Sequence, residues 1–322
     1  MSPIHSSTPI PPLSILFAGA GAFGVPTLQA IVGAGHRVPL VVTQPDKPAG
    51  RGAKLTPTPI AEAALALGLP VLKTADINAE ALPPADLLVV IAFGQKIADH
   101  VIHAQRLGAV NLHASRLPKY RGAAPINRAI LAGETIAGNS IIRLAQKMDA
   151  GAVLAMSEVP IGELETAGEL HDRLSQDGAP LMLKVIDDLA AGKAVEVEQD
   201  HSQATLASKL SRESTRIDFA GRAADIARQI RGFYPWPGCR VKLITADGRA
   251  VDSMRLIRAR AAGGNASAGA MPGQVLTSGL VAAGDGLLEV VALQPDGKRP
   301  MPLVDYRRGK PWEAGMRLES MV

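Results

Sequence analysis

Short apolar runs alternate with helical patterns along the first half of the chain. Runs at 13–20, 36–43 and 86–94 read as strands, and amphipathic segments at 25–35 and 59–69 lie between them as helices. The apolar runs are continuous, which is typical of strands covered on both faces. The pattern predicts βαβ units and a Rossmann-like, mostly parallel sheet whose ligands bind where the strands end.

Two further strands and a long helix extend this pattern. The strands are predicted at 108–114 and 151–161, and the amphipathic helix covers 166–192. Thr166 and Glu169 stand at the spacing of a capping box, in which each side chain satisfies a backbone N–H of the first turn. The first half of the chain therefore predicts an α/β domain.

The pattern of apolar and polar residues changes after this helix. The stretch 193–214 is polar and weakly periodic, and 221–233 reads as one helix. Beyond it, 239–261 reads as two strands around an Asp-Gly turn, and 274–297 contains short strands separated by turn signals. Strands of this kind are typical of a small, OB-like β-barrel.

We expect the 322 residues to form two domains. The fold class is α/β, with a Rossmann-like sheet in the first domain and a smaller β-barrel in the second. A flexible tail, the catalytic domain, a linker and the barrel domain are predicted at 1–12, 13–193, 194–205 and 206–322.

Charge differs between the two halves. The net charge is +4, but residues 205–322 carry 18 Lys and Arg against 11 Asp and Glu, while the rest of the chain has a small acidic excess. A basic second domain is compatible with an ordinary solvated surface or with a polyanionic partner. Charge alone does not choose between them.

The amino-acid composition indicates the cellular compartment in which we expect the protein. The single cysteine, Cys239, excludes an internal disulfide and a CxxC zinc pattern. The apolar part of the N-terminal stretch is too short for a signal peptide, and no window approaches about 18 apolar residues in a row. We expect a soluble, cytoplasmic protein that does not contact a membrane.

The first strand-to-helix turn carries Gly19, Gly21 and Gly24 at GxGxxG spacing. This spacing suits a dinucleotide, because the glycines allow a tight turn and close approach to a pyrophosphate. Such a site also needs an acid at the end of the second strand, and Asp46 lies further on, inside a basic loop. A nicotinamide oxidoreductase is therefore one alternative.

Candidate acyl-transfer chemistry lies in NLHASRLPKYRG, at 111–122. Asn111 and His113 are two residues apart at the end of a predicted strand, so their side chains share one face. An amide donor beside an imidazole suits a tetrahedral intermediate at a carbonyl, where one group holds the oxyanion and the other moves a proton.

The stretch 111–130, followed by MDAG at 148–151, resembles the folate-dependent formyltransferase family. The motif of that family is Asn-x-His-x-Ser-Leu-Leu-Pro-x-x-Arg-Gly, with a distant Asp. The resemblance extends from Leu13 to about Leu189 and implies the formyltransferase fold. In the family the Asp orients the imidazole and favours its charged form. The implied catalytic trio is Asn111, His113 and Asp149.

The resemblance also implies a folate site and 10-formyltetrahydrofolate as co-substrate, with neither a metal nor NAD. The pterin would lie against the backbone of 89–96, and a second loop would bind the tetrahydrofolate. Arg116 in that loop departs from the Leu of the family. The implied folate-binding residues are Ser115, Arg116, Leu117, Pro118, Ile91, Phe93 and Gly94.

Within the family, the chain is similar to the members that act on methionyl-tRNA. The basic segment 43–64 resembles their insertion loop, and 206–219 resembles the start of their C-terminal barrel. A basic loop can follow a phosphate backbone without reading bases. Phe23 would border the methionine side chain. The residues expected to face tRNA phosphates are Lys47, Arg51 and Lys54.

The resemblance implies that a monomer transfers the formyl group of 10-formyltetrahydrofolate to the α-amino group of aminoacylated initiator tRNA. An amino-sugar or purine-precursor formyltransferase, an oxidoreductase and a non-catalytic tRNA-binding module are the alternatives. In the family, Thr and Pro stand where this chain has Ala20 and Gly21. The GxGxxG spacing is therefore interpreted as a substituted formyltransferase turn.

Three other residues receive structural interpretations. Trp236, between two prolines, is predicted to anchor the core. His100 and His103 are three apart on a predicted helix, but no carboxylate or thiol pattern accompanies them, so we predict surface residues.

Overall fold

The computed structural model describes residues 11–49, 54–264 and 269–321. The chain forms two compact units, and it passes from one to the other more than once. The first unit comprises Met1–Arg121, Gly138–Glu158 and Asp172–Leu206, and the second comprises Gly122–Ala137, Val159–His171 and Ala207–Val322. Most of the predicted tail lies outside the described residues.

The first unit is built on a seven-stranded sheet with the order β11-β10-β7-β6-β1-β2-β5. The five strands from β7 to β5 are parallel, whereas β10 pairs antiparallel with both β7 and β11. The predicted Rossmann-like, mostly parallel sheet is confirmed. Its strands are β1 Ile15–Gly19, β2 Val41–Thr43, β5 Val71–Lys73, β6 Leu87–Ile91, β7 Ala109–His113, β10 Ser140–Arg143 and β11 Val153–Met156.

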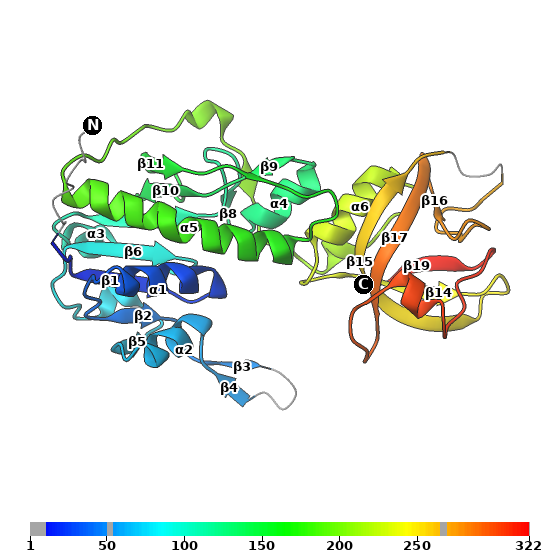
Figure 1. Cartoon of the computed structure of the whole chain (residues 1–322), viewed down its shortest axis with the longest axis horizontal. Helices are drawn as coiled ribbons and strands as arrows, with labels where there is room; N and C mark the ends of the chain where they lie inside the picture. The colour runs from blue at the N-terminus through cyan, green and yellow to red at the C-terminus, as the bar shows by residue number, and fades with distance from the viewer. Residues whose placement is uncertain (1–10, 50–53, 265–268, 322) are drawn as a thin grey trace, which may run out of the picture. The chain divides into compact units, whose positions relative to one another are not determined.

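Helices cover both faces of this sheet. Leu16 and Val90 pack in one cluster with Val101 of α3, whereas alternate residues face the opposite way. On that opposite face, Gly178 of α5 lies against Leu112, and Figure 1 shows α5 and α1 in front of β6 and β1. The helices are α1 Val25–Gly33, α2 Pro59–Ala66, α3 Asp99–His103 and α5 Ala167–Ala190. None in the described chain is long and apolar enough to cross a membrane.

The second unit contains a curled antiparallel sheet with the order β16-β17-β15-β14-β19, and β18 pairs with β17. Gly273 joins the two edge strands, because its N–H donates to Ala282 O (2.8 Å) and its carbonyl accepts from Leu318 N (2.9 Å). The predicted second, smaller β-barrel domain is thus observed as a curled sheet closed through this segment. The strands are β14 Cys239–Ile244, β15 Ala250–Ala262, β16 Val281–Ala283, β17 Gly286–Pro295, β18 Met301–Pro302 and β19 Arg317–Met321.

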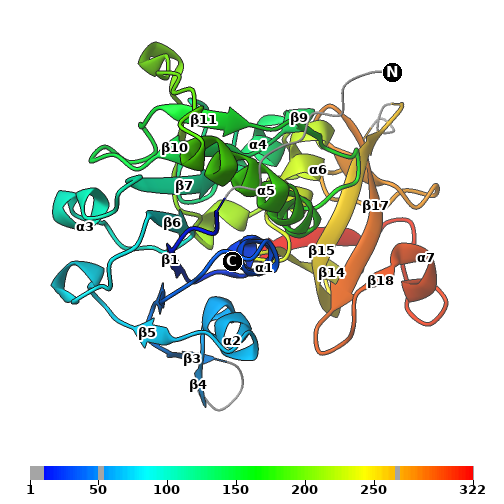
Figure 2. The same cartoon turned by 60° about the vertical axis from the view of Figure 1, so that its left-hand side comes forward.

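Helix α6 (Ala223–Gly232) packs on this sheet, beside β15 and β17 in Figure 2. Ile226 and Ile230 are buried with Leu256 in one core. The prediction for Trp236 is wrong, since 56% of it is exposed. The buried tryptophan is Trp312, whose Nε1 donates to Gly279 O. Two prolines fix the chain around Trp236 in a surface turn, a setting that its apolar side chain does not reveal.

Short elements complete the fold, and some differ from the prediction. The predicted strand 151–161 divides into β11 and β12, which belong to different sheets. Ser157 and Glu158 separate the two strands, and this polar pair was read as part of one strand. The basic loop forms an unpredicted hairpin, β3–β4. The short elements are β3 Lys47–Ala49, β4 Lys54–Thr56, β8 Arg121–Gly122, β9 Ile136–Ala137, β12 Val159–Pro160, β13 Leu206–Ala207, α4 Pro125–Ala132, α7 Leu303–Tyr306, and the 3-10 turns Ala22–Gly24, Ile77–Ala79, His201–Gln203 and Glu213–Thr215.

The predicted capping box at the start of α5 is confirmed. Thr166 N donates to Glu169 Oε2 (3.0 Å), and Glu169 N donates to Thr166 Oγ1 (3.4 Å). Glu169 Oε2 also accepts from Arg258 Nη1 at 2.8 Å. All three residues belong to the second unit, so this carboxylate ties a helix start to β15.

The stability of the second unit is expected to depend on Glu169 in acid. The Arg258 guanidinium and the Thr166 hydrogen bonds lower the pKa of Glu169 from 4.5 to about 2. A lowered pKa means that the stabilisation is complete above pH 4.5 and is lost as the pH falls towards 2. Because the side chain is 46% exposed, screening reduces the contribution to about 1 kcal/mol.

The measurement is urea unfolding of wild type and Glu169→Gln from neutral to acid pH. We expect the difference in unfolding free energy to shrink as the pH falls. The exposed Glu313→Gln is the control, with no such trend. A difference independent of pH would contradict this role of the charge.

Candidate active site

Strand β7 carries two of the predicted site residues at its end. Asn111 and His113 point to the same face of the strand, as predicted, and His113 is the last residue of β7. In the sheet register, Asn111 pairs with Val90 of β6, and His113 pairs with Ser140 of β10. Asn111 is half-buried and His113 is buried. The pair therefore lies at the carboxyl edge of the parallel strands.

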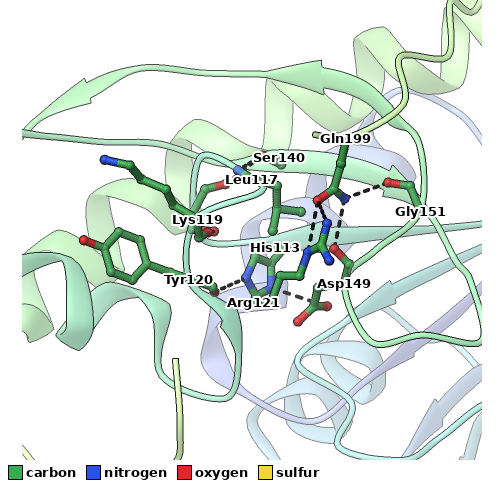
Figure 3. Close-up of polar contacts among 10 residues, drawn as sticks. His113, Leu117, Lys119, Tyr120, Arg121, Ser140, Asp149, Gly151 and Gln199 are labelled. Atoms are coloured by element: carbon green, nitrogen blue, oxygen red, sulfur yellow. Dashed lines mark hydrogen bonds and ion pairs between the residues drawn. The ribbon is translucent and has the colours of Figure 1, made fainter. Parts of the chain in front are cut away.

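His113 is held on both sides of its ring (Figure 3). Its Nε2 lies 2.8 Å from Tyr120 O, and its Nδ1 lies 3.6 Å from Asp149 Oδ1. A carbonyl only accepts, so Nε2 must carry the proton of that hydrogen bond. The side chains of His113 and Asp149 are only 8% and 14% exposed. The structure thus brings Asp149 to the imidazole, and the two form a shielded pair when the ring is charged.

Asp149 lies in a tight turn between β10 and β11. Its φ of 52° is in the left-handed region, which costs a non-glycine residue about 1–2 kcal/mol. Such a conformation persists where the surroundings fix it. Gly151 allows the turn, because a Cβ at this position would lie 1.9 Å from Arg143 O. The MDAG sequence therefore matches a geometric requirement of the turn.

Two buried polar residues of the first unit, Arg121 and Gln199, fix this turn. Gln199 Nε2 donates to Asp149 O (2.9 Å) and Gly151 O (2.7 Å), while Gln199 Oε1 accepts from Arg121. Gln199 lies in the polar stretch predicted as a linker, which offered no motif. Arg121 stands in the Arg-Gly pair that ends the quoted motif, so of these two residues it alone had a signal in the sequence.

The loop at 115–118 is fixed by its own hydrogen bonds. Ser115 Oγ donates to Lys119 O (2.7 Å), and Leu117 N donates to Ser140 Oγ (3.0 Å). Ser140 Oγ in turn donates to Ser115 O at 2.7 Å. Ser115 and Leu117 are buried and Pro118 is half-buried. Ser140, which no motif indicated, therefore anchors the predicted folate loop to β10.

Arg116, which departs from the family motif, has an acidic partner. Its Nη2 forms an ion pair with Glu158 Oε1. A Cβ on Gly138 would lie 3.0 Å from Arg116 Cγ, so the side-chain stem packs against that glycine. The Arg116 side chain therefore lies beside Gly138, which precedes β10, and Glu158, which follows β11. Its predicted contact with folate stays a prediction.

The predicted pterin segment follows β6. Ile91 and Phe93 are buried, with 0% and 2% of each residue exposed. Phe93 O accepts from Gln44 Nε2 at 3.0 Å. Gly94 is exposed, with a φ of 77°. The contact of this segment with the pterin therefore stays a prediction.

The predicted tRNA contacts lie on the β3–β4 hairpin. Lys47 and Lys54 are exposed on its two strands, where Lys47 pairs with Thr56. Arg51 lies outside the described residues. Asp46 precedes the hairpin and forms an ion pair with Lys73 of β5 (2.7 Å).

The glycine turn is explained by packing at two of its three positions. A Cβ on Gly19 would lie 2.9 Å from Ile91 O, and one on Gly24 would lie 3.2 Å from Ile60 Cδ1. At Gly21 the nearest neighbour would be 3.5 Å away, an ordinary contact. Gln44, not an acid, follows β2. These contacts support a strand-to-helix turn packed on β6 and α2.

Phe23, the predicted neighbour of the methionine side chain, lies in the same turn. It is buried, and its carbonyl accepts a hydrogen bond from Ser175 Oγ of α5 at 2.8 Å.

Within the described ranges, no group of three or more His, Cys, Asp or Glu is arranged to hold a metal. His100 is exposed, with Nε2 at 3.2 Å from Asn78 O.

Comparison with known proteins identifies related chains. The family descriptions "Formyl transferase" and "Formyl transferase, C-terminal domain" match residues 13–186 and 209–311. Methionyl-tRNA formyltransferase of Acidobacterium capsulatum is 41% identical over 92% of this chain and 96% of its own. The protein of the same name from Sinorhizobium fredii is 41% identical over 95% and 99%.

A solved structure shows the same fold. WlaRD is a sugar 3N-formyl transferase solved in the presence of dTDP and 5-N-formyl-THF. It matches 89% of this chain and 99% of its own with a TM-score of 0.61, at 20% identity. The matches over both units, and above all the relatives at 41% identity, show that this chain belongs to the formyl transferase family, together with the curated methionyl-tRNA formyltransferases.

Proposed function

We propose that this enzyme transfers the formyl group of 10-formyltetrahydrofolate to the α-amino group of methionyl-tRNA, with the initiator tRNA as acceptor. The observation that carries the proposal is the 41% identity to methionyl-tRNA formyltransferases over nearly the whole chain, including the second unit. The sugar formyl transferase shares only the fold, at 20% identity. We further propose a cytoplasmic monomer that uses neither a metal nor NAD.

The proposed chemistry needs no covalent enzyme intermediate. The amine of methionyl-tRNA attacks the formyl carbon, the new C–N bond forms, and the bond to folate N10 breaks as a proton passes from the amine to N10. Negative charge develops on the formyl oxygen. Asn111 donates a hydrogen bond to that oxygen, and the positive charge of His113 stabilises it. Asp149 orients the imidazole and pairs with its charge.

The rest of the site binds and positions the substrates. The 115–118 loop and the backbone of Ile91, Phe93 and Gly94 hold the folate, and Phe23 borders the methionine side chain. Ser140 supports this proposal, because its hydroxyl accepts a hydrogen bond from Leu117 N and donates one to Ser115 O, which fixes the loop backbone. A preformed site of this kind lowers the barrier by holding the two reacting groups in place.

One assay tests the function. The protein is mixed with 10-formyltetrahydrofolate and methionyl-tRNA, and N-formylmethionyl-tRNA is measured. An amino-sugar nucleotide and a purine-precursor amine are supplied separately as competing acceptors, and NADH absorbance is followed in parallel. Formylation of methionyl-tRNA alone is expected. Formylation of another acceptor, or NADH oxidation without formylation, would reject the proposal.

Lys54→Ala is expected to weaken tRNA engagement with little change in kcat. Lys54 is exposed at the start of β4, and a phosphate contact contributes affinity without touching the reacting atoms. The KM for methionyl-tRNA should rise several-fold, and the slope of log affinity against log salt should fall by about 1. Steady-state kinetics at several salt concentrations measure both.

Lys193→Ala is the matched control, because Lys193 is exposed but lies after α5, far along the chain from the hairpin. It should leave KM and the salt slope unchanged. Equal effects of the two variants would show that Lys54 contributes only general charge.

A further inference from the structure

We infer that Gln199 is a positioning residue of the active site, acting through Asp149 and His113. The inference rests on the proposed function, because it assigns a role within the same reaction. Gln199 is buried and lies outside every motif of the family resemblance. Its side chain lies between the backbone of the Asp149 turn and the guanidinium of Arg121, and it contacts both (Figure 3).

The amide of Gln199 uses its full hydrogen-bonding capacity. Nε2 donates to the carbonyls of Asp149 (2.9 Å) and Gly151 (2.7 Å). Oε1 accepts from Arg121 Nε (3.1 Å) and Nη2 (2.5 Å). A carbonyl only accepts and a guanidinium only donates, so the amide has a single possible orientation. Arg121 thus turns the donor end of Gln199 towards the Asp149 turn.

Backbone pairing delivers Gln199 to this place. Val197 N donates to Val153 O (2.9 Å), and Val153 N donates to Val197 O (2.8 Å), at the start of β11. Two residues later, Gln199 reaches back to the turn that precedes β11. Thr205 holds the other segment, since its carbonyl accepts from Arg121 N and its Oγ1 from Tyr120 N. Residues 197–205, which we call the clasp, therefore bind both segments.

These hydrogen bonds determine how the His113 ring is held. Tyr120 O holds its Nε2, and Tyr120 is adjacent to Arg121, while Asp149 faces its Nδ1. Gln199 joins Arg121 to the backbone of Asp149, so one amide sets the spacing of the two groups that hold the ring. The left-handed backbone of Asp149 persists only where surrounding groups hold it. Gln199 is one such group, because it donates a hydrogen bond to the Asp149 carbonyl.

Gln199→Glu separates this role from simple packing. The carboxylate has the same shape and still accepts from Arg121, but it cannot donate to the two carbonyls and repels them. The turn should shift by a fraction of an ångström, and kcat should fall about tenfold, less than the roughly 10²-fold of a 1 Å misplacement. KM for both substrates should stay within twofold. The melting temperature should fall, because two carbonyls lose their donor, and the ion pair with Arg121 limits this loss.

Gln176→Glu is the matched control, the same change at an exposed side chain of α5, outside the clasp. It should leave kcat unchanged. In an Asp149→Ala background, Gln199→Glu should cause no further loss, since residues that act as one unit are not additive. Equal losses in both backgrounds, or wild-type kcat in Gln199→Glu, would overturn the inference.

A substrate-free measurement keeps the inference separate from the proposed function. The ¹⁵N and ¹H signals of the His113 imidazole, assigned by their absence in His113→Asn, should move in Gln199→Glu and stay in place in Gln176→Glu. Unmoved signals would reject the positioning role even in an active enzyme. A wild-type protein that fails to formylate methionyl-tRNA would reject the function and leave this spectral test of Gln199 in force.

Discussion

Asn111→Ala is expected to lower kcat by about 10²- to 10³-fold, which corresponds to about 2.7–4 kcal/mol of transition-state stabilisation. The strand places this amide on the same face as His113, which lies between Tyr120 and Asp149. His113 Nε2 already donates to Tyr120 O, so Asn111 becomes the main direct donor to the developing charge in the proposed reaction. Removing it leaves no replacement on that strand. Steady-state formylation assays at saturating substrates measure the loss.

The affinity for tRNA should survive this change, because Asn111 touches only the reacting group in the proposed mechanism. Asn127→Ala is a suitable control. Its Nδ2 donates to Gly232 O (2.7 Å) in the second unit, so the change costs about 1 kcal/mol of stability and leaves kcat unaltered. Unchanged turnover in Asn111→Ala would show that the amide has no role in stabilising charge.

The sequence predicts the fold of this chain well where one physical pattern dominates. Continuous apolar runs such as 86–94 have a single reading, because strands covered on both faces leave no place for polar residues. The GxGxxG spacing was a weaker signal, and the contacts of Gly19 and Gly24 with β6 and α2 explain why two glycines are needed there without a dinucleotide. Asn111 and His113 were predictable because residues two apart on a strand must share a face.

The missing parts of the prediction depend on contacts between distant segments. Asp149 came from the family motif alone, since nothing in its local sequence indicates that a loop returns it to His113, 36 positions earlier. Gln199 and Ser140 hold active-site backbone by hydrogen bonds to main-chain atoms, and such bonds impose no pattern on the partner sequence. Trp236 was misjudged because an aromatic side chain carries the same signal in a core and on a surface.

Gly151→Ala is expected to disable the enzyme although it changes none of the catalytic residues. A Cβ at this position would lie 1.9 Å from Arg143 O, so the backbone must move. The displaced segment includes Asp149 and the Gly151 carbonyl that Gln199 binds. A 1 Å misplacement costs about 10²-fold in kcat. The strain should also lower the unfolding free energy by about 1–3 kcal/mol. Kinetics and urea unfolding measure the two effects.

Gly33→Ala shows what the same chemical change does where there is room. Gly33 ends α1, and a Cβ there would meet nothing within 4 Å. Alanine removes backbone freedom from the unfolded chain, so this variant should be about 0.5–1 kcal/mol more stable, with kcat unchanged. If Gly151→Ala kept wild-type kcat, the turn could adapt without moving Asp149. The left-handed backbone of Asp149 would then not be what sets its distance from His113.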